Sequence, residues 1–112
     1  MNADVEAEVE PDFEPSAGAI RQAVSICNAR GLHARPSAAI SKLVGNFDAH
    51  VTISASGEVA EADSIMDLLM LGAGPGSRVV LAAEGIEAAE AVAALAAFIE
   101  RGFDETPRSG GD

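Results

Sequence analysis

Residues 31–36 read Gly-Leu-His-Ala-Arg-Pro, and this stretch determines how the chain around it is organised. Proline is tolerated in the first turn of an α-helix, because the amide that it lacks would find no partner inside the helix. Pro36 therefore predicts a helix that begins at about Ala34, with His33 at its N-cap. The free amides of Ala34 and Arg35 would then point outward at the positive end of the helix dipole, and such a helix start binds phosphate readily.

His33 and Arg35 are the residue types that phosphoryl chemistry needs at such a helix start. Arg35 offers a planar, permanently charged group that fits phosphate oxygens, and histidine can act as a neutral nucleophile near pH 7. A lone histidine at a helix start is, however, more often a cap or a surface residue. On spacing alone, a phosphorylatable His33 is the less frequent of these two interpretations.

The segments on either side of this stretch continue the pattern of a mixed α and β fold. Residues 22–28 alternate between apolar and polar types, which predicts a half-buried strand. The helix after His33 carries its apolar residues on one face and is expected to end at Gly45. The solvent face of this helix is expected to hold Ser37, Ser41 and Lys42.

The rest of the chain predicts three more strands and two more helices. The strands are expected at residues 49–54, 58–62 and 78–83, and the helices at residues 64–71 and 87–101. The order strand, helix, strand, strand, helix, strand, helix predicts an α+β fold. Its expected form is an open-faced β-sandwich, in which a four-stranded antiparallel sheet carries three helices on one face.

The helix predicted at residues 64–71 is apolar on more sides than contact with a core requires. Ser64 begins it, because Asp67 three residues later completes an approximate capping box. On a helical wheel, Ile65, Leu68 and Leu71 can face the core, whereas Met66 and Met70 point away from it and Leu69 lies at the boundary. Exposed apolar patches usually mark contact surfaces, although burial of so short a helix is an equal alternative. The residues expected in a partner-docking surface are Ile65, Met66, Leu69, Met70 and Lys42.

Negative charge is concentrated at the N-terminus. The 112 residues carry a formal net charge of −11, and residues 1–16 contain six acidic residues and no basic one. Such a composition packs poorly. We therefore predict a disordered acidic extension over residues 1–19, a folded domain over residues 20–103 and a flexible tail over residues 104–112.

The composition also argues against several classes of function. The domain is acidic and lacks Trp and Tyr, so we expect no nucleic-acid binding. No secretion signal or long apolar stretch is present, so we expect a cytoplasmic protein without membrane insertion, and by default a monomer. Cys27 has no partner for an internal disulfide, and its apolar neighbours predict a buried or half-buried thiol.

No feature of the sequence supports a cofactor, a metal site or a hydrolytic enzyme. His50 has no second histidine or cysteine at a ligand spacing, so we expect no metal site. The glycines at residues 72–76 lack the lysine of a phosphate loop, and no Ser-His-Asp set can be assigned from spacing. A hydrolase or a nucleotide-binding enzyme is therefore not supported.

Two stretches carry a family resemblance. They are NARGLHARP at residues 28–36 and SIMDLLML at residues 64–71, which Gly72 follows. In this order and at this distance they resemble the HPr family, the histidine-containing phosphocarrier proteins of the bacterial phosphotransferase system. The resemblance extends from about Arg21 to Glu100.

The resemblance implies a role for each stretch. In this family the histidine that matches His33 is phosphorylated on Nδ1 by Enzyme I, with phosphoenolpyruvate as the original donor, and passes the phosphoryl group to an Enzyme IIA domain. The chain would then be a carrier and not a stand-alone enzyme, with Ala34 and Arg35 binding the phosphoryl group. The serine that matches Ser64 is modified in many bacteria by HPr kinase/phosphorylase, which implies regulatory phosphorylation there.

Several alternatives stay open. Capping alone explains Ser64 equally well, and the main rival to a carrier is a regulatory binding module of the same fold, controlled by Ser64 while His33 is little used. Within the carrier interpretation, sugar transport and a nitrogen-related relay are not separated. The chain departs from many relatives by its acidic extension, by Glu58 where a basic residue is common, and by few basic residues near the docking face. We therefore expect its partner preference to differ.

Overall fold

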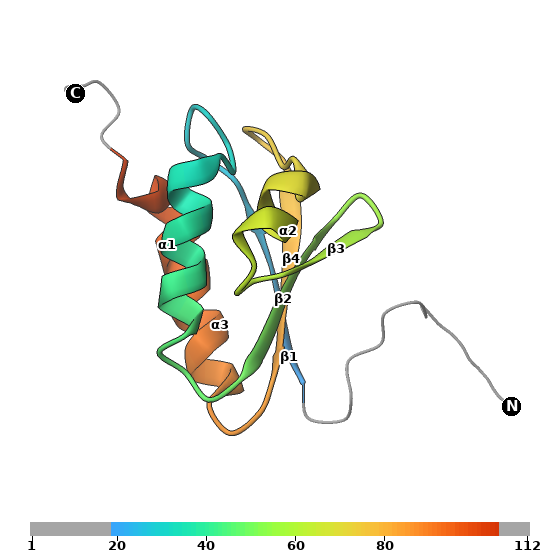
Figure 1. Cartoon of the computed structure of the whole chain (residues 1–112), viewed down its shortest axis with the longest axis vertical. Helices are drawn as coiled ribbons and strands as arrows, with labels where there is room; N and C mark the ends of the chain where they lie inside the picture. The colour runs from blue at the N-terminus through green and yellow to red at the C-terminus, as the bar shows by residue number, and fades with distance from the viewer. Residues whose placement is uncertain (1–18, 106–112) are drawn as a thin grey trace, which may run out of the picture.

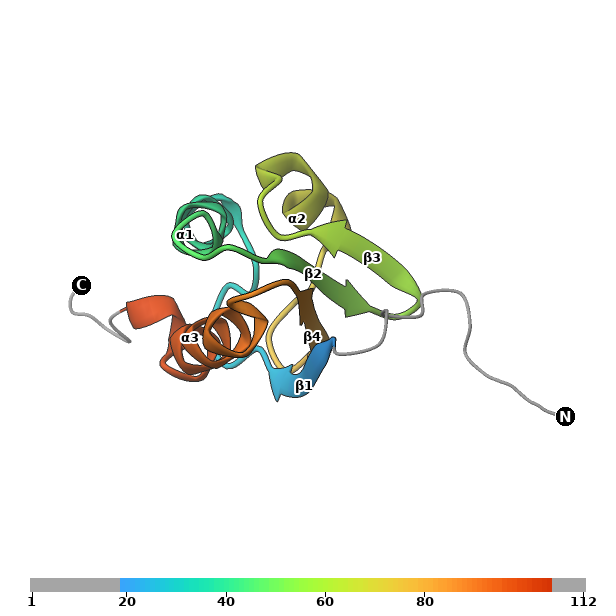
Figure 2. The same ribbon diagram turned by 90° about the horizontal axis from the view of Figure 1, so that it is seen from below.

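The computed structural model describes residues 19–105, in which four strands form one antiparallel sheet and three α-helices pack against one face of it (Figure 1, Figure 2). The strands are β1 (Ile20–Ser25), β2 (His50–Ala55), β3 (Glu58–Glu61) and β4 (Arg78–Glu84). The helices are α1 (Ala34–Val44), α2 (Ile65–Leu71) and α3 (Ala88–Glu100), and a short 3₁₀ helix, η1 (Gly102–Asp104), follows them. The predicted open-faced β-sandwich is confirmed.

The strands lie in the order β1-β4-β2-β3, so the last strand of the sequence occupies the interior of the sheet. In β4, Leu81 pairs with Gln22 of β1 and with Ile53 of β2. Leu81 and Ile53 point to the helical side, and both are almost completely buried. Complete burial of such a side chain contributes roughly 1.5–3 kcal/mol. Further large core side chains include Val79 from the sheet and Ile40, Leu68, Leu95 and Ile99 from the helices.

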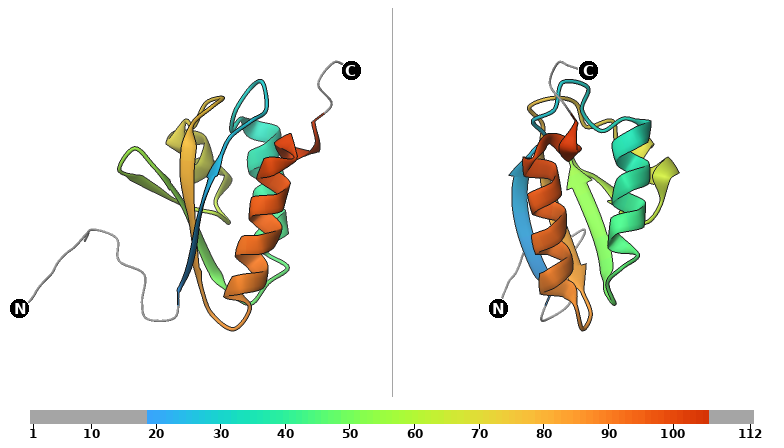
Figure 3. Two further views of the ribbon diagram at one scale, coloured as in Figure 1. Left: turned by 180° about the vertical axis from the view of Figure 1, so that it is seen from behind. Right: turned by 90° about the vertical axis from the view of Figure 1, so that its left-hand side faces the viewer.

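The helices divide the covered face of the sheet between them. Figure 3 shows α1 and α3 running side by side along the sheet, and α2 contacts β3, β2 and α1 at the other edge. β1 and β4 are antiparallel, so α1 starts near the end of β1 whereas α3 starts near the end of β4, at the opposite end of the sheet. α3 then runs back along the sheet, and its end meets the start of α1 (Figure 1). The candidate site lies at this end.

The first helix begins at Ala34 as predicted, but β1 differs from the strand predicted at residues 22–28. It begins at Ile20, which pairs with Ala83 of the long strand β4. It ends at Ser25, because the backbone of Ile26 bonds to the loop before β4: its amide donates to Ser77 O at 2.8 Å and its carbonyl accepts from Gly76 N at 2.8 Å. This contact with a distant segment sets the end of the strand.

Three side chains differ from their predicted exposure. Ser37, predicted on the solvent face of α1, is fully buried, because it is three and seven residues before Ile40 and Val44 and shares their face. Cys27 is exposed and not buried, since the alternation that turns Ile26 inward turns its neighbour outward. Ile65, placed on the core side of its helix, is 42% exposed.

Both ends of the chain lie largely outside the described residues. The predicted acidic extension is represented only by Ala19, and the predicted flexible tail only by Asp104 and Glu105. Asp104 ends η1, and both of its carboxylate oxygens accept hydrogen bonds from Arg101. No helix within residues 19–105 is long and apolar enough to cross a membrane.

Candidate functional site at the start of α1

The loop before α1 is held by a glycine that no other residue could replace without strain. Gly31 has a φ of +69°, and a Cβ at this position would lie 2.7 Å from the carbonyl oxygen of Ala73. The next residue, Leu32, is buried and its amide donates to the same oxygen at 2.9 Å. The loop between α2 and β4 therefore fixes the position from which α1 starts.

His33 is the N-cap of α1, as predicted. Its backbone is extended, with φ −98° and ψ −167°, and its carbonyl accepts the hydrogen bond of Ser37 N at 3.0 Å. Its imidazole makes no capping bond, so the ring is available for other contacts. The ordinary explanation of a histidine at a helix start as a side-chain cap therefore does not hold here.

The start of α1 has the electrostatic character of an anion site. Ala34 and Arg35 are exposed, and their amides belong to the first turn, where no intrahelical carbonyl can accept them. The first turn contains no acidic residue that would neutralise the helix dipole. Arg35 adds a permanent positive charge beside His33. The structure thus brings His33, Ala34 and Arg35 together at one helix terminus.

The imidazole of His33 contacts a carboxylate from the end of the described chain. Nε2 of His33 lies 2.7 Å from Oε2 of Glu105, and both side chains are about three-quarters buried. The other oxygen, Oε1, accepts a hydrogen bond from Nδ2 of Asn28 at 2.9 Å. Nδ1 of His33 has no hydrogen-bond partner within residues 19–105. The ring therefore has one engaged and one open nitrogen.

The surroundings of Glu105 keep its carboxyl group ionised. Burial by itself would raise the pKa of Glu105, but hydrogen bonds from Asn28 and His33 lower it, and the positive charges of a protonated His33 and of Arg35 act in the same direction. The resulting pKa lies below the ordinary value of a glutamate. Near neutral pH, this carboxylate can only accept hydrogen bonds.

Sequence reasoning did not identify Asn28 or Glu105 as members of the site. Asn28 belongs to the NARGLHARP stretch, but its type alone suggested a turn. Glu105 lies 72 residues after His33, beyond the last α-helix, and was assigned to the flexible tail. No local spacing connects residues that are so far apart, so the contact could be found only from the fold.

Ser64 caps α2, and the capping part of its prediction is confirmed. Its Oγ accepts the hydrogen bond of Asp67 N at 3.1 Å. The carboxylate of Asp67 does not close the box on Ser64 N; it accepts from Glu61 N at 3.2 Å, while Ser64 N donates to Glu61 O. Ser64 thus joins α2 to the end of β3, and it is half-buried.

The apolar residues predicted for docking form one exposed patch on α2. Met66 and Met70 are 66% and 79% exposed, and Ile65 and Leu69 are exposed beside them. We call these four residues the α2 patch. Figure 1 shows α2 beside the N-terminal half of α1, so the patch and His33 lie at the same end of the molecule.

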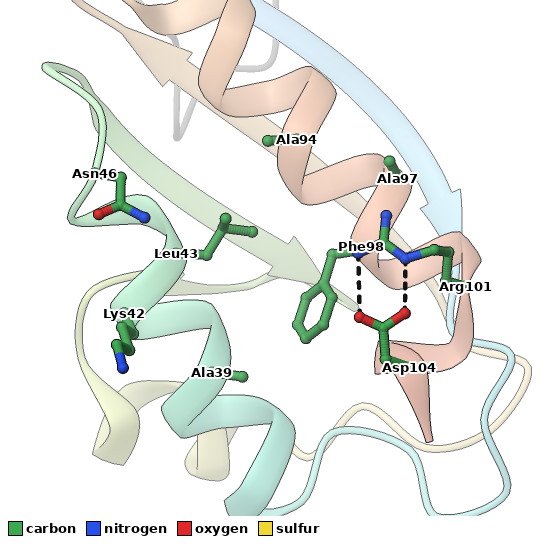
Figure 4. Close-up of a pocket in the computed structure, with 9 residues that line it drawn as sticks. All are labelled: Ala39, Lys42, Leu43, Asn46, Ala94, Ala97, Phe98, Arg101 and Asp104. Atoms are coloured by element: carbon green, nitrogen blue, oxygen red, sulfur yellow. Dashed lines mark hydrogen bonds and ion pairs between the residues drawn. The ribbon is translucent and has the colours of Figure 1, made fainter. Parts of the chain in front are cut away.

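Lys42 lies apart from the α2 patch. It is in the last turn of α1 and lines a groove of about 450 Å³ between α1 and α3 (Figure 4). The preceding residue, Ser41, contacts the loop before α2 instead. At the end of this groove, Arg101 pairs with Asp104 and lies over the ring of Phe98, 5.7 Å from its centroid. The structure therefore does not unite all five predicted docking residues.

The comparison with known proteins agrees with this geometry. Residues 20–101 match the family model described as the PTS HPr component phosphorylation site. The chain belongs to the HPr family. Proteins of this family are phosphocarriers and not stand-alone enzymes. The family match covers the helix start, the α2 patch and all four strands.

Relatives and solved structures of the family align over most of their own length. The chain is 41% identical to the phosphocarrier protein NPr of Klebsiella oxytoca over 87 residues, which cover 77% of this chain and 97% of the relative. It is 43% identical to the phosphocarrier protein HPr of Cupriavidus necator over 86 residues, with the same coverage. The crystal structure of HPr-C-His from Thermoanaerobacter tengcongensis superposes with a TM-score of 0.74 at 35% identity, covering 77% of this chain and 97% of that one.

Proposed function

We propose that this chain accepts a phosphoryl group on Nδ1 of His33 from phosphorylated Enzyme I and passes it to an Enzyme IIA type acceptor. The observation that carries the proposal is the position of the imidazole: it stands at a helix start whose first turn contains no acidic residue, makes no capping bond and leaves Nδ1 open. The phosphoryl oxygens would then face the amides of Ala34 and Arg35 and the Arg35 guanidinium. These donors stabilise the charge without a covalent contact, which suits transfer in both directions.

The chain offers a matched control for the test. His50 is also bonded to a glutamate, with Nε2 lying 2.6 Å from Oε1 of Glu61, but it is in β2 and far more exposed. Incubation with Enzyme I and phosphoenolpyruvate should add one acid-labile phosphoryl group, seen by intact mass, to the wild type and to His50→Ala. His33→Ala should gain none. A labelled His33→Ala, or an unlabelled folded wild type, would contradict the proposal.

The α2 patch is proposed as the surface on which partners dock. It is apolar, exposed and at the same end of the molecule as His33, so a protein that covers it would bring its own phosphoryl donor or acceptor group near Nδ1. Enzyme I, Enzyme IIA type domains and, for Ser64, HPr kinase/phosphorylase are the proposed partners. Lys42 is proposed as a peripheral contact, since it faces the groove between α1 and α3.

We further propose a nitrogen-branch relay in preference to sugar transport. The support is the names of similar relatives, among them the phosphocarrier proteins NPr of Klebsiella oxytoca and Escherichia coli. The relative from Cupriavidus necator carries the name HPr, so the choice needs an experiment. Initial rates of phosphorylation by the nitrogen-branch and the sugar-branch Enzyme I should differ in favour of the former. A faster reaction with the sugar-branch enzyme would reverse the assignment.

Regulation at Ser64 is the second candidate function, and the position of Ser64 favours it. The residue begins the helix that carries the α2 patch, so a phosphoserine would add about −1.5 to −2 charges beside an apolar contact surface. Docking would weaken through repulsion and desolvation. If the protein is mainly a regulatory module, Ser64→Ala should abolish its function in cells while His33→Ala does not. The opposite result supports the carrier.

A further inference from the structure

We propose that Glu105 is a positioning residue for His33: its carboxylate holds the proton on Nε2, so that Nδ1 presents a lone pair for attack on phosphorus. This inference rests on the proposed transfer through His33 and adds a residue from the other end of the domain. The same carboxylate then faces the positive charge that the ring gains during transfer. Glu105 touches neither phosphorus nor donor, so it acts through the imidazole.

The orientation of the Glu105 carboxylate is set by Asn28. The amide nitrogen Nδ2 of Asn28 lies 2.9 Å from two acceptors, the carbonyl oxygen of Gly31 and Oε1 of Glu105. The reversed amide would place its oxygen against both acceptors, so the hydrogen-bond network fixes Nδ2 as the donor. Asn28 is buried and belongs to the loop that precedes His33. With Oε1 held in this way, Oε2 is the oxygen directed at Nε2.

The contact determines the tautomer of a neutral His33. An ionised carboxylate has no proton to donate, so a hydrogen bond of 2.7 Å between Oε2 and Nε2 requires the proton to be on Nε2. A neutral imidazole then carries its lone pair on Nδ1. Carboxylates that hold one ring nitrogen in this way orient the other for nucleophilic or acid–base chemistry in other sites.

The same contact fits the charge balance of the transfer. The lone pair of Nδ1 forms the new N–P bond while the bond between phosphorus and the donor atom of phosphorylated Enzyme I breaks, and the electron pair of that bond returns to the donor atom. Nε2 keeps its proton, so the phosphorylated ring carries a positive charge next to Glu105. When the phosphoryl group moves on, the electron pair of the N–P bond returns to Nδ1. No proton has to leave His33 at any step.

The buried side chain of Phe103, just after α3, positions Glu105 beside His33. After α3 the chain turns through Gly102, at φ +70°, and Phe103, at φ +59°. Phe103 is buried and packs edge to face on Phe98, with ring centroids 5.4 Å apart. The following residues therefore turn toward the start of α1, as Figure 3 shows for η1. Because Phe103 fixes the backbone two residues before Glu105, the contact between Glu105 and His33 follows from the packing of the domain.

The test compares Glu105→Gln and Glu105→Ala with Glu90→Gln. Glu90 is an exposed residue in the first turn of α3, at the far end of that helix, and its replacement removes the same charge. In ¹⁵N-labelled protein above the pH range in which imidazole titrates, wild type and Glu90→Gln should show His33 with a protonated Nε2 and an unprotonated Nδ1. Glu105→Ala should show exchange between tautomers, and the signals of His50 should stay unchanged as an internal reference.

Phosphoryl transfer provides the second readout. Because a charge-assisted hydrogen bond is roughly twice as strong as a neutral one, Glu105→Gln should slow the initial rate of phosphorylation by roughly tenfold. Glu90→Gln should match the wild type. An unchanged His33 tautomer in Glu105→Ala, or an unchanged rate in Glu105→Gln while the wild type is phosphorylated normally, would overturn this inference alone. A wild type that gains no phosphoryl group on His33 would overturn the proposed function itself.

Discussion

Replacing Gly31 by alanine should destabilise the domain more than the same replacement at Gly57. Both glycines have a positive φ, +69° at Gly31 and +83° at Gly57. A left-handed backbone costs an alanine roughly 1–2 kcal/mol, and both variants share this cost. The two positions differ in the room available for a methyl group. A Cβ at Gly31 would lie 2.7 Å from Ala73 O and 2.8 Å from Gly74 Cα, whereas nothing lies within 4 Å of a Cβ at Gly57.

The close contacts at Gly31 involve backbone atoms, which cannot rotate away as a side chain could. The start of α1 or the loop before β4 must therefore move, and overpacking of this kind costs roughly 1–3 kcal/mol more. We expect a loss in the free energy of unfolding of about 1–2 kcal/mol for Gly57→Ala and about 2–5 kcal/mol for Gly31→Ala. Domains of this size are stable by only about 5–15 kcal/mol, so the difference is large.

Urea denaturation followed by far-ultraviolet circular dichroism measures both losses, since the chain has no Trp or Tyr to report by fluorescence. Phosphoryl acceptance should also slow in Gly31→Ala, because the displaced loop carries His33, and should not change in Gly57→Ala. Equal losses of stability in the two variants would refute the argument that close approach of two loops positions the start of α1.

Four further predictions concern other parts of the domain. Ser37→Ala should raise the free energy of unfolding by about 1–2 kcal/mol in urea denaturation, because Oγ of Ser37 is buried without a hydrogen-bond partner among the described residues. Ser64→Ala should lower it by about 1 kcal/mol through loss of the cap, with phosphoryl transfer little changed. Met70→Asp, at an exposed position, should leave the melting temperature nearly unchanged but weaken binding to Enzyme I in calorimetry by about tenfold or more. The lowered pKa of Glu105 stabilises the folded state; this contribution should be complete above the pKa of an unfolded glutamate and be lost as the pH falls through the lower folded pKa. The free energy of unfolding of the wild type should therefore decline toward acid pH more steeply than that of Glu105→Gln.

Local rules predicted the elements of the fold and their order. Pro36 determined the start of α1 correctly, because the restriction that proline imposes on a helix involves only neighbouring residues. The common inward direction of Val79 and Leu81, two residues apart in β4, likewise follows from the pleat of a single strand. The end of β1 was not predictable in this way, since it depends on hydrogen bonds from Ile26 to residues about 50 positions later.

The site was predicted only in part for the same reason. His33, Ala34 and Arg35 are consecutive, so their common position at a helix start follows from the helix itself. Glu105 joins them only because η1 turns the chain back toward α1, and no periodicity in the sequence records this turn. Ser37 is buried although its hydroxyl favours the solvent face, because its spacing from Ile40 places it on the core face of α1.

The most direct test of the account is to locate the phosphoryl group on the ring. After reaction with Enzyme I and phosphoenolpyruvate, ¹H–¹⁵N spectra of the labelled chain should show phosphorus bonded to Nδ1 of His33, with the proton retained on Nε2. A phosphoryl group on Nε2 of His33, or on His50, would contradict the assignment of Nδ1 as the open nitrogen and of Glu105 as the group that holds the other.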